Sequence, residues 1–418
     1  MPFAPRLLTV ENEEEAREEI LRVGSDPAGV ERMAAKMVRK LVKLTGVPCR
    51  AANILKQEML ALGGDAAVAR GTVACAVAET DVILIGSLKK LRLLCRRLTS
   101  QPFGLADFSG QLDGLLQNLD NPARTLAGRN CRLELDRPRI MGVLNVTPDS
   151  FSDGGRFDSL EKALQRGREM SRDGADLIDV GGETTRPGAV AVSVQIEMDR
   201  VAPVIEGLRR ELDIPLSIDT NKAAVAKTAM ALGADFINDI SGLRFDPQMA
   251  SVAAETGAGL FLMHTRGRPE EMQRDTRYRD MIGEIIAYLR GSVEAALAAG
   301  VAPEKLAVDP GIGFGKSPEG NLEILRRLRE FQTLGLPVLL GTSRKGFIGK
   351  ALGQPDPEMR LFGTLATVAL GVEKGARIFR VHDVRPARET AMMAWAVCRG
   401  EMPGKLNPRS EESEVRRK

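Results

Sequence analysis

The chain contains 418 residues, of which 43% are hydrophobic and 28% are charged, and its 59 Lys and Arg residues nearly balance its 56 Asp and Glu residues. This composition excludes intrinsic disorder and collagen-like repeats, and the small net charge gives no overall field that would make nucleic acid or an anionic membrane the default partner. The length excludes a single small domain and allows either two domains or one large domain with an extension.

The cysteines and the N-terminal sequence indicate a cellular compartment. The five cysteines are widely spaced, without a Cys-x-x-Cys pair, which argues against a disulfide framework and a structural zinc site. The N-terminal sequence turns acidic where a secretory signal needs an apolar segment, and no apolar stretch is long enough to span a membrane. We therefore expect a cytoplasmic protein.

The first part of the chain differs from the rest in its pattern of charged and apolar residues. Residues 11–50 are charged with helical spacing, and the apolar run DVILIGS from Asp81 predicts a buried strand. Residues 88–98 place leucines on one helical face and Lys and Arg on the other; a solvated helix is the simplest interpretation, and an anion site is the alternative. We expect a smaller α/β domain without assignable chemistry at residues 1–132, a second domain at 133–400 and a flexible tail at 401–418.

The second part contains short apolar runs separated by segments with helical periodicity. Eight runs occur: IMGVLNV, DLIDVGG, PLSID, DFINDIS, GLFLMHT, LAVDPG, PVLLGTS and RIFRVHD. Eight alternations of strand and helix are typical of an α/β TIM (β/α)8 barrel. A doubly wound open sheet is the alternative, although no Gly-x-Gly-x-x-Gly motif follows an early strand.

Polar residues follow every run, at the strand ends where barrel enzymes build their active sites. They are Asn145, Asp179, Glu183, Asp219, Asn238, Asp239, His264, Asp309, Ser343, Arg344, Lys345, Arg380, His382 and Asp383. A single Asp or Asn at such a position is more often the N-cap of the next helix. Polar groups at all eight ends, with both histidines of the chain among them, favour one polar pocket.

Two loops strengthen the prediction of an active site. NVTPDSFSDGG and GGETTRPGA, which follow the first two runs, have the composition of loops that close over a substrate. Arg186, Lys345, Arg380 and His382 could converge on a phosphate or diphosphate, because guanidinium and ammonium groups match phosphate oxygens. The Asp and Asn side chains suit a flat heterocycle with N–H donors. A heterocyclic phosphate ester or diphosphate is therefore the expected substrate.

The motifs resemble those of the dihydropteroate synthase family. They are IMGVLNVTPDSFSDGG, IDVGGETTRPGA, LSIDT, INDISG, DPGIGFGK, GTSRKGFIG and RVHDV, and they cover residues 138–398. The resemblance implies that 6-hydroxymethyl-7,8-dihydropterin diphosphate condenses with 4-aminobenzoate to give 7,8-dihydropteroate and diphosphate, assisted by Mg²⁺. It also implies a homodimer that binds small-molecule substrates rather than nucleic acid or a membrane.

The same resemblance assigns roles to individual residues. The expected catalytic set is Asp219, Lys345, Arg186, Phe151, Asp153, Thr185 and Pro187. The expected substrate-binding set is Asn238, Asp309, Met263, Phe314, Arg380 and His382. Asn145 is the expected Mg²⁺ ligand. Within these sets, Arg186, Arg380 and His382 resemble the diphosphate site, and the two loops resemble the parts that create the aminobenzoate pocket.

The chain departs from the family pattern at two positions and leaves two alternatives open. Gly346 stands where the family often has Ser, and Thr265 where it often has Met, so the departures bear on aminobenzoate affinity and sulfonamide response rather than on the reaction. A corrinoid-linked methyltetrahydrofolate methyltransferase barrel is one alternative, although it lacks the SFSDGG and TTRPGA loops. A non-catalytic pterin-binding paralogue is the other, and a turnover assay with both substrates separates it from the synthase.

Overall fold

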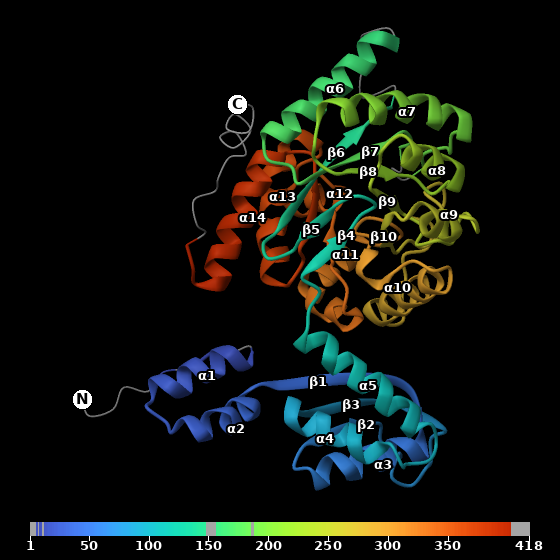
Figure 1. Cartoon of the computed structure of the whole chain (residues 1–418). Helices are drawn as coiled ribbons and strands as arrows, with labels where there is room; N and C mark the ends of the chain where they lie inside the picture. The colour runs from blue at the N-terminus through green and yellow to red at the C-terminus, as the bar shows by residue number, and fades with distance from the viewer. Residues whose placement is uncertain (1–5, 7, 11, 148–155, 185–187, 403–418) are drawn as a thin grey trace. The chain divides into compact units, whose positions relative to one another are not determined.

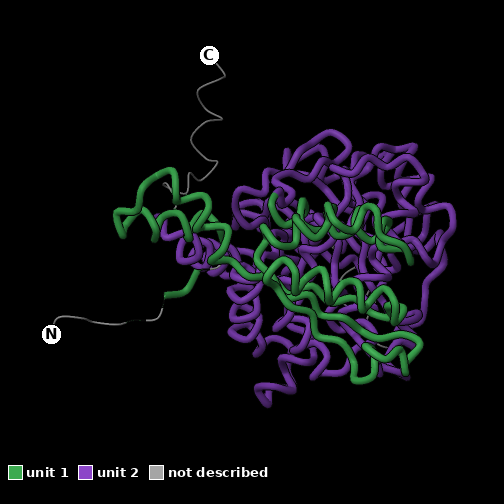
Figure 2. The backbone as a smooth tube through the Cα atoms, turned by 90° about the horizontal axis from the view of Figure 1, so that it is seen from below, with its two compact units in different colours: residues 1–120 green, residues 121–418 purple. Residues whose placement is uncertain are grey.

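The computed structural model describes residues 6, 8–10, 12–147, 156–184 and 188–402. The chain divides into two compact units, unit 1 at Met1–Asp120 and unit 2 at Asn121–Lys418 (Figure 2). The division therefore falls before the boundary expected after residue 132, because residues 121–132 belong with the barrel. None of the described helices is both long and apolar enough to cross a membrane.

Unit 1 is a three-stranded antiparallel sheet with helices (Figure 1). Its elements are α1 (Glu13–Arg22), α2 (Pro27–Met37), β1 (Arg39–Pro48), α3 (Cys49–Ala61), β2 (Asp65–Val68), β3 (Glu79–Ser87), α4 (Leu88–Leu98) and α5 (Leu105–Asp120). The strands lie in the order β1-β3-β2. The expected strand after Asp81 is β3. Four of the leucines of α4 are buried in one cluster with Leu55 and Met59 of α3: Leu88, Leu91, Leu94 and Leu98. The predicted α/β character of this region is confirmed.

Unit 2 is a parallel eight-stranded barrel. Its strands are β6 (Arg139–Asn145), β7 (Leu177–Gly181), β8 (Leu216–Asp219), β9 (Phe236–Asp239), β10 (Gly259–Met263), β11 (Leu306–Asp309), β12 (Leu339–Leu340) and β13 (Ile378–Val381). The sheet order is β11-β10-β9-β8-β7-β6-β13-β12, and a parallel bridge between Val308 and Val338 joins its two ends. The predicted TIM barrel is confirmed.

Helices follow the strands around the outside of the barrel (Figure 1). The α-helices are α6 (Arg156–Arg172), α7 (Val194–Glu211), α8 (Ala223–Ala231), α9 (Met249–Thr256), α10 (Met281–Ala298), α11 (Pro318–Arg326), α12 (Gly346–Leu352), α13 (Leu361–Glu373) and α14 (Val384–Arg399). The 3-10 helices within the described residues are η2 (Pro303–Lys305), η3 (Leu328–Leu334) and η4 (Pro357–Arg360). Local sequence sets several boundaries: the Ser193 side chain caps the start of α7, and Gly257 ends α9 in the left-handed conformation.

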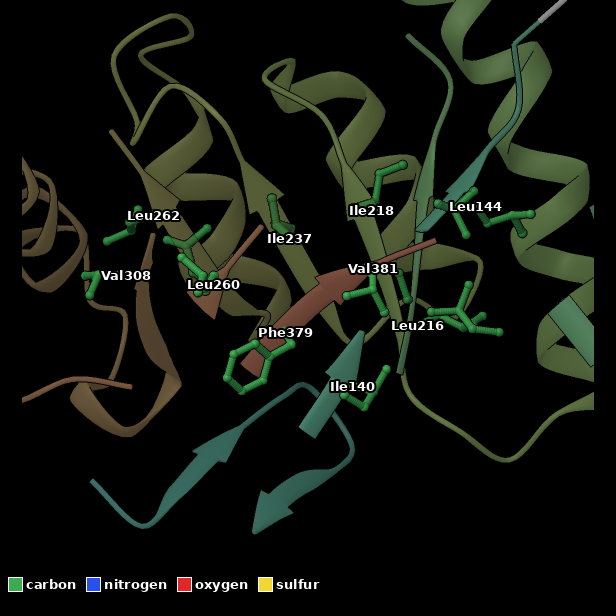
Figure 3. Packing of buried hydrophobic residues seen from close by; sticks show 14 of the residues in the cluster. Ile140, Leu144, Leu216, Ile218, Ile237, Leu260, Leu262, Val308, Phe379 and Val381 are labelled. Atoms are coloured by element: carbon green, nitrogen blue, oxygen red, sulfur yellow. The ribbon is translucent and has the colours of Figure 1, made fainter. Parts of the chain in front are cut away.

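Strand alternation divides the apolar side chains of the barrel into two layers. Ile140, Ile178, Ile237 and Phe379 belong to the large cluster between strands and helices, of which Figure 3 shows a part. The neighbouring residues belong to a second cluster inside the barrel, which includes Met141, Leu177, Phe236, Phe261, Ala307, Leu339 and Ile378. Successive side chains point to opposite faces of a strand, so this parity fixes which residues face the barrel interior.

A hairpin fills the N-terminal end of the barrel. It consists of β4 (Thr125–Ala127) and β5 (Arg132–Glu134), paired antiparallel. Leu126 and Leu133 are buried in the same cluster as Phe236 and Phe261. The apolar side chains of the hairpin therefore cover this end of the barrel interior.

Candidate active site

The alternation of side chains along each strand, which places apolar residues inside the barrel, also sets the direction of the polar residues at the strand ends. Asp179, Asn238, Met263, Asp309 and Arg380 each lie two positions after a residue of the interior cluster, so they face the same way. Asp219 shares this orientation, because its neighbours Leu216 and Ile218 belong to the outer cluster. Six of the expected site or strand-end residues therefore line the barrel interior at the C-terminal ends of the strands.

Arg380 connects three of these strands. Its Nε lies 2.7 Å from Oδ2 of Asp179, and its Nη2 lies 2.7 Å from Oδ2 of Asp219. Asn238 donates to the same Asp179 oxygen at 2.9 Å. The other oxygen of Asp179, Oδ1, is buried without a hydrogen-bond partner among the described residues. Arg380, expected in the diphosphate site, is thus tied to Asp219, which is expected in the pterin site, and to Asp179.

Burial and neighbouring charges set the pKa values of the side chains in and around this network. Burial raises the pKa of Asp219 to about 7; Arg380 opposes this shift and Asp179 adds to it. Burial also raises the pKa of Asp309, against the opposing charge of Lys345. For Arg380, burial acts to lower the pKa, but the carboxylates of Asp179 and Asp219 outweigh it and the pKa is raised. A fixed cation therefore sits beside a carboxyl that titrates near neutrality.

Lys345 follows the seventh strand, β12, by five residues and lies directly before α12. Its Nζ donates to the carbonyl of Ile312 and lies 4.9 Å from the centre of the Phe314 ring. Burial lowers its pKa to about 8, partly offset by the charge of Asp309. Lys345 and Phe314, both expected site residues, are therefore brought together beside Asp309.

The seventh and eighth strand ends are joined by side chains. Ser343 Oγ lies 2.9 Å from Nδ1 of His382 and accepts from the His382 backbone N–H at 3.2 Å. Arg344 has a positive φ of 58° and forms a two-pronged ion pair with Asp383, at 2.7 and 3.0 Å. Burial, with Arg380 and Arg344 nearby, lowers the pKa of His382 to about 4. His382 is therefore a neutral hydrogen-bonding group at pH 7.

Comparison with known proteins identifies the family. Residues 141–382 match the family model of the pterin binding enzymes. Dihydropteroate synthase of Synechocystis is 50% identical over 263 residues, which cover 63% of this chain and 91% of that protein. The chain belongs to the dihydropteroate synthase family. The predicted resemblance is confirmed.

Further relatives show the extent of the similarity. Dihydropteroate synthase of Xanthomonas albilineans, solved with 4-aminobenzoic acid, is 42% identical with a TM-score of 0.62 and covers 66% of this chain and 98% of its own. The same organism's enzyme with 7,8-dihydropteroate is 40% identical with a TM-score of 0.60, covering 65% of this chain and 98% of its own.

One relative extends beyond the barrel. A probable bifunctional folylpolyglutamate synthase/dihydropteroate synthase of Halobacterium salinarum is 44% identical over 375 residues, which are 90% of this chain but 45% of that protein. Because this alignment is longer than unit 2, the similarity reaches into unit 1. Unit 1 therefore has a counterpart in at least one family member.

Several expected site residues have no described structure. Phe151, Asp153, Thr185, Arg186 and Pro187 lie outside the described residues. Asn145 is described at the end of β6, next to β7. Its Oδ1 and Oδ2 of Asp219 would each lie 3.6 Å from a β-carbon built on Gly181, so the two side chains flank the same glycine.

The structure groups Glu183, one of the polar residues expected at a strand end, with two charged residues that sequence patterns did not single out. Lys222 donates to both Glu183, two residues after β7, and Glu197 of α7. The side chain of Glu197 is only 1% exposed, and burial raises its pKa although Lys222 opposes this shift. No local pattern in the sequence marks this cluster, since the three residues lie in separate segments. The cluster fixes the start of the second loop.

The two histidines have different surroundings. Nδ1 of His264 lies 2.8 Å from Nζ of the buried Lys316, and its ring packs edge-on against Tyr288. Burial and the Lys316 charge lower the pKa of His264 to about 2. Lys316 also donates to the carbonyl of Phe314 at 2.8 Å. His264 thus supports the loop that carries Phe314, whereas His382 contacts Ser343.

Proposed function

We propose that the chain condenses 6-hydroxymethyl-7,8-dihydropterin diphosphate with 4-aminobenzoate, giving 7,8-dihydropteroate and diphosphate. The observation that carries this proposal is the largely buried network of Arg380 with Asp179, Asp219 and Asn238. A dihydropterin presents N–H donors along one edge, and carboxylate and amide oxygens accept such donors. The solved relative with 7,8-dihydropteroate supports the choice of ligand.

The chemistry needs charge stabilisation rather than a protein nucleophile. When diphosphate leaves the CH₂ group, the pterin becomes a delocalised cation, which the carboxylates of Asp179, Asp219 and Asp309 stabilise. The aniline nitrogen of 4-aminobenzoate is already nucleophilic and attacks this carbon. Lys345, beside Asp309, donates to an acceptor on the pterin ring. Arg186 and His382 are proposed to hold the departing diphosphate.

The donor groups fit a magnesium ion carried by the substrate. Among the described residues, no three His, Cys, Asp or Glu side chains are grouped so that they could hold a metal ion. Mg²⁺ in phosphate chemistry usually takes one or two protein oxygens and completes its shell with phosphate and water. The carboxamide of Asn145 supplies one such oxygen. When bound, the ion neutralises charge on the leaving diphosphate.

An exposed apolar face supports a homodimer. Phe362 and Leu370 of α13 and Met393 and Val397 of α14 are large apolar side chains left in solvent, with Phe362 82% exposed. The two helices pack against each other, so these side chains lie on neighbouring helices. Large apolar side chains exposed on neighbouring helices favour an interaction site, and a second copy of the chain would bury the same side chains on both subunits by symmetry. A Phe362→Glu variant should then be monomeric in light scattering.

We also propose a cytoplasmic location. None of the five cysteines is joined in a disulfide in the structure, as expected of a compartment that keeps thiols reduced.

The reaction is tested by measuring diphosphate release from the pterin diphosphate with and without 4-aminobenzoate. Release that depends on both substrates, with formation of dihydropteroate, is the expected result. Asp309→Asn should lose most activity while keeping its fold, because it removes one charge without changing side-chain size. Pterin binding without any turnover would instead identify a non-catalytic paralogue.

A further inference from the structure

Unit 1 brings together two cysteines that are far apart in the sequence. Cys49 begins α3 and is buried, whereas Cys75 is exposed in the turn segment between β2 and β3. Their Sγ atoms lie 2.8 Å apart. A disulfide bond measures about 2.05 Å, so the two free thiols lie closer than an ordinary non-bonded contact but are not bonded.

The surrounding hydrogen bonds hold the pair in place. The carbonyl of Thr72 accepts from the Cys49 thiol at 2.9 Å and from Nδ2 of Asn53 at 2.8 Å. The same carbonyl accepts from the backbone N–H of Cys75 at 3.0 Å. Nδ2 of Asn53 also lies 3.7 Å from Sγ of Cys75. One carbonyl and one amide therefore contact both cysteines.

The backbone of Cys75 is also unusual. Its φ of 49° lies in the left-handed region, which residues with a β-carbon rarely adopt. Such conformations persist only where the surrounding contacts enforce them. Here the turn bonds of Thr72 and Ala76 flank the residue and direct its thiol to Cys49.

We propose that Cys49 and Cys75 are a modification site that forms a reversible disulfide with a low-molecular-weight disulfide, such as glutathione disulfide, as the oxidant. The exposed Cys75 reacts first: its thiolate attacks one sulfur of glutathione disulfide, and one glutathione leaves as a thiolate that takes up a proton. Cys49 then gives its proton to water and attacks Sγ of Cys75, which expels the second glutathione. Two electrons pass from the protein thiols to the oxidant, and two glutathione thiols are formed.

The other cysteines lack these features. Burial raises the pKa of Cys95 to about 11 and that of Cys131 to about 12, which suppresses their thiolates. The pKa of Cys49 is also raised, by its hydrogen bond to Cys75 and by burial, so Cys49 is distinguished by the exposed thiol 2.8 Å from its own sulfur and not by its pKa. Cys398 of α14 is exposed and provides a solvent-accessible thiol for comparison. In a reducing cytoplasm, disulfides are usually transient, which matches a pair with one accessible thiol.

The test uses the full chain, treated with glutathione disulfide, alkylated and digested with trypsin. Cleavage after Lys43, Arg50, Arg70 and Lys89 separates the two cysteines into peptides 44–50 and 71–89. We expect these peptides to be joined by a disulfide that dithiothreitol releases. Because the second attack is intramolecular, glutathione on Cys75 should be at least about tenfold less abundant in the wild type than in Cys49→Ser.

Control variants separate this mechanism from general thiol oxidation. Cys398→Ser should leave the linked peptides unchanged, and Cys75→Ser should leave Cys49 reduced. Accumulation of glutathione on Cys75 in the wild-type chain, or absence of the linked peptides while Cys398 reacts, would overturn the proposal. Circular dichroism checks that each variant is folded. Both results that would overturn the proposal are measured on the wild-type chain, so they do not depend on the folding of a variant.

Discussion

Arg380 on the last strand of the barrel pairs with Asp219 on the third, with Nη2 2.7 Å from Oδ2. This pair is largely buried, so neither charge is well solvated, and each depends on the other. The second carboxylate, Asp179, shares the same guanidinium. A ligand that displaces these contacts must offer hydrogen bonds of its own to the buried carboxylates. The N–H donors along one edge of a pterin can do so.

Pterin binding should show a bell-shaped pH dependence. Asp219 accepts N–H donors as a carboxylate, and with a pKa of about 7 it is increasingly protonated below that pH. Lys345 donates as an ammonium group, and with a pKa of about 8 it loses its proton above that pH. Affinity is therefore greatest between these values and falls by up to about tenfold per pH unit on either side. Calorimetric titration from about pH 5.5 to about pH 9.5 measures this profile.

An Asp219→Asn variant provides the control for the acid limb. The amide cannot titrate, so its affinity should be weaker overall and independent of pH below about 7. If the wild-type affinity is constant across the whole range, these two residues do not control pterin binding.

Lys222→Met should destabilise unit 2. The substitution removes the cation from the buried Glu197 and leaves an unpaired carboxylate, which costs about 3 to 5 kcal/mol of unfolding free energy. It also releases Glu183 at the start of the second loop, so the KM for the pterin diphosphate should rise. Thermal unfolding and steady-state kinetics measure the two effects.

The double variant Lys222→Met/Glu197→Gln separates charge from packing. Replacing the carboxylate with an amide removes the unpaired charge, so part of the lost stability should return. Equal stability of the single and double variants would show that the Lys222–Glu197 pair is not responsible.

Gly346→Ser should improve aminobenzoate binding without changing the fold. Gly346 is exposed and lacks a positive φ, and a β-carbon added there would meet no heavy atom within 4 Å. The added hydroxyl lies beside Lys345 and can donate to the aminobenzoate carboxylate, which stabilises binding by about 1.5 to 3 kcal/mol. The KM for 4-aminobenzoate should therefore fall by roughly tenfold or more.

Gly346→Ala is the matched control, because it adds the β-carbon but no hydroxyl. Its KM should equal that of the wild type. Identical KM values for the Ser and Ala variants would mean that the hydroxyl does not reach the carboxylate.

The barrel is predictable from the sequence because each of its strands is buried on both faces and therefore reads as a continuous apolar run. The polar residue that ends each run is visible for the same reason, as with Asp219 and Asp309. The partners of these residues are not visible: Arg380 and Asp179 are separated by 201 positions and meet only through strand order. The Cys49–Cys75 pair depends in the same way on a turn geometry that spacing does not encode.

The β4–β5 hairpin escapes prediction for a different physical reason. Its strands have three residues each, too few for an alternating pattern to stand out. The change in sequence pattern near residue 133 therefore indicates a domain boundary there, whereas unit 2 begins at Asn121.

Two truncations that differ by this hairpin strand should behave differently. Removing residues 1–120 deletes unit 1 alone and should leave a folded barrel that binds the pterin, since unit 2 has its own core. Removing residues 1–132 also deletes β4, including the fully buried Leu126. The loss uncovers the interior cluster around Phe236 and Phe261, which are themselves fully buried. Loss of one buried leucine side chain typically costs about 2 to 5 kcal/mol, and here the paired strand β5 loses its hydrogen-bond partner as well.

The shorter fragment should therefore unfold at a markedly lower temperature or aggregate, whereas the longer one keeps a cooperative transition. Thermal unfolding followed by circular dichroism, with pterin titration of each fragment, compares them. A Leu126→Ala substitution in the longer fragment gives the intermediate case, because it keeps the strand pairing and removes only the buried side chain. Equal stability of the two truncations would mean that the hairpin does not close the N-terminal end of the barrel.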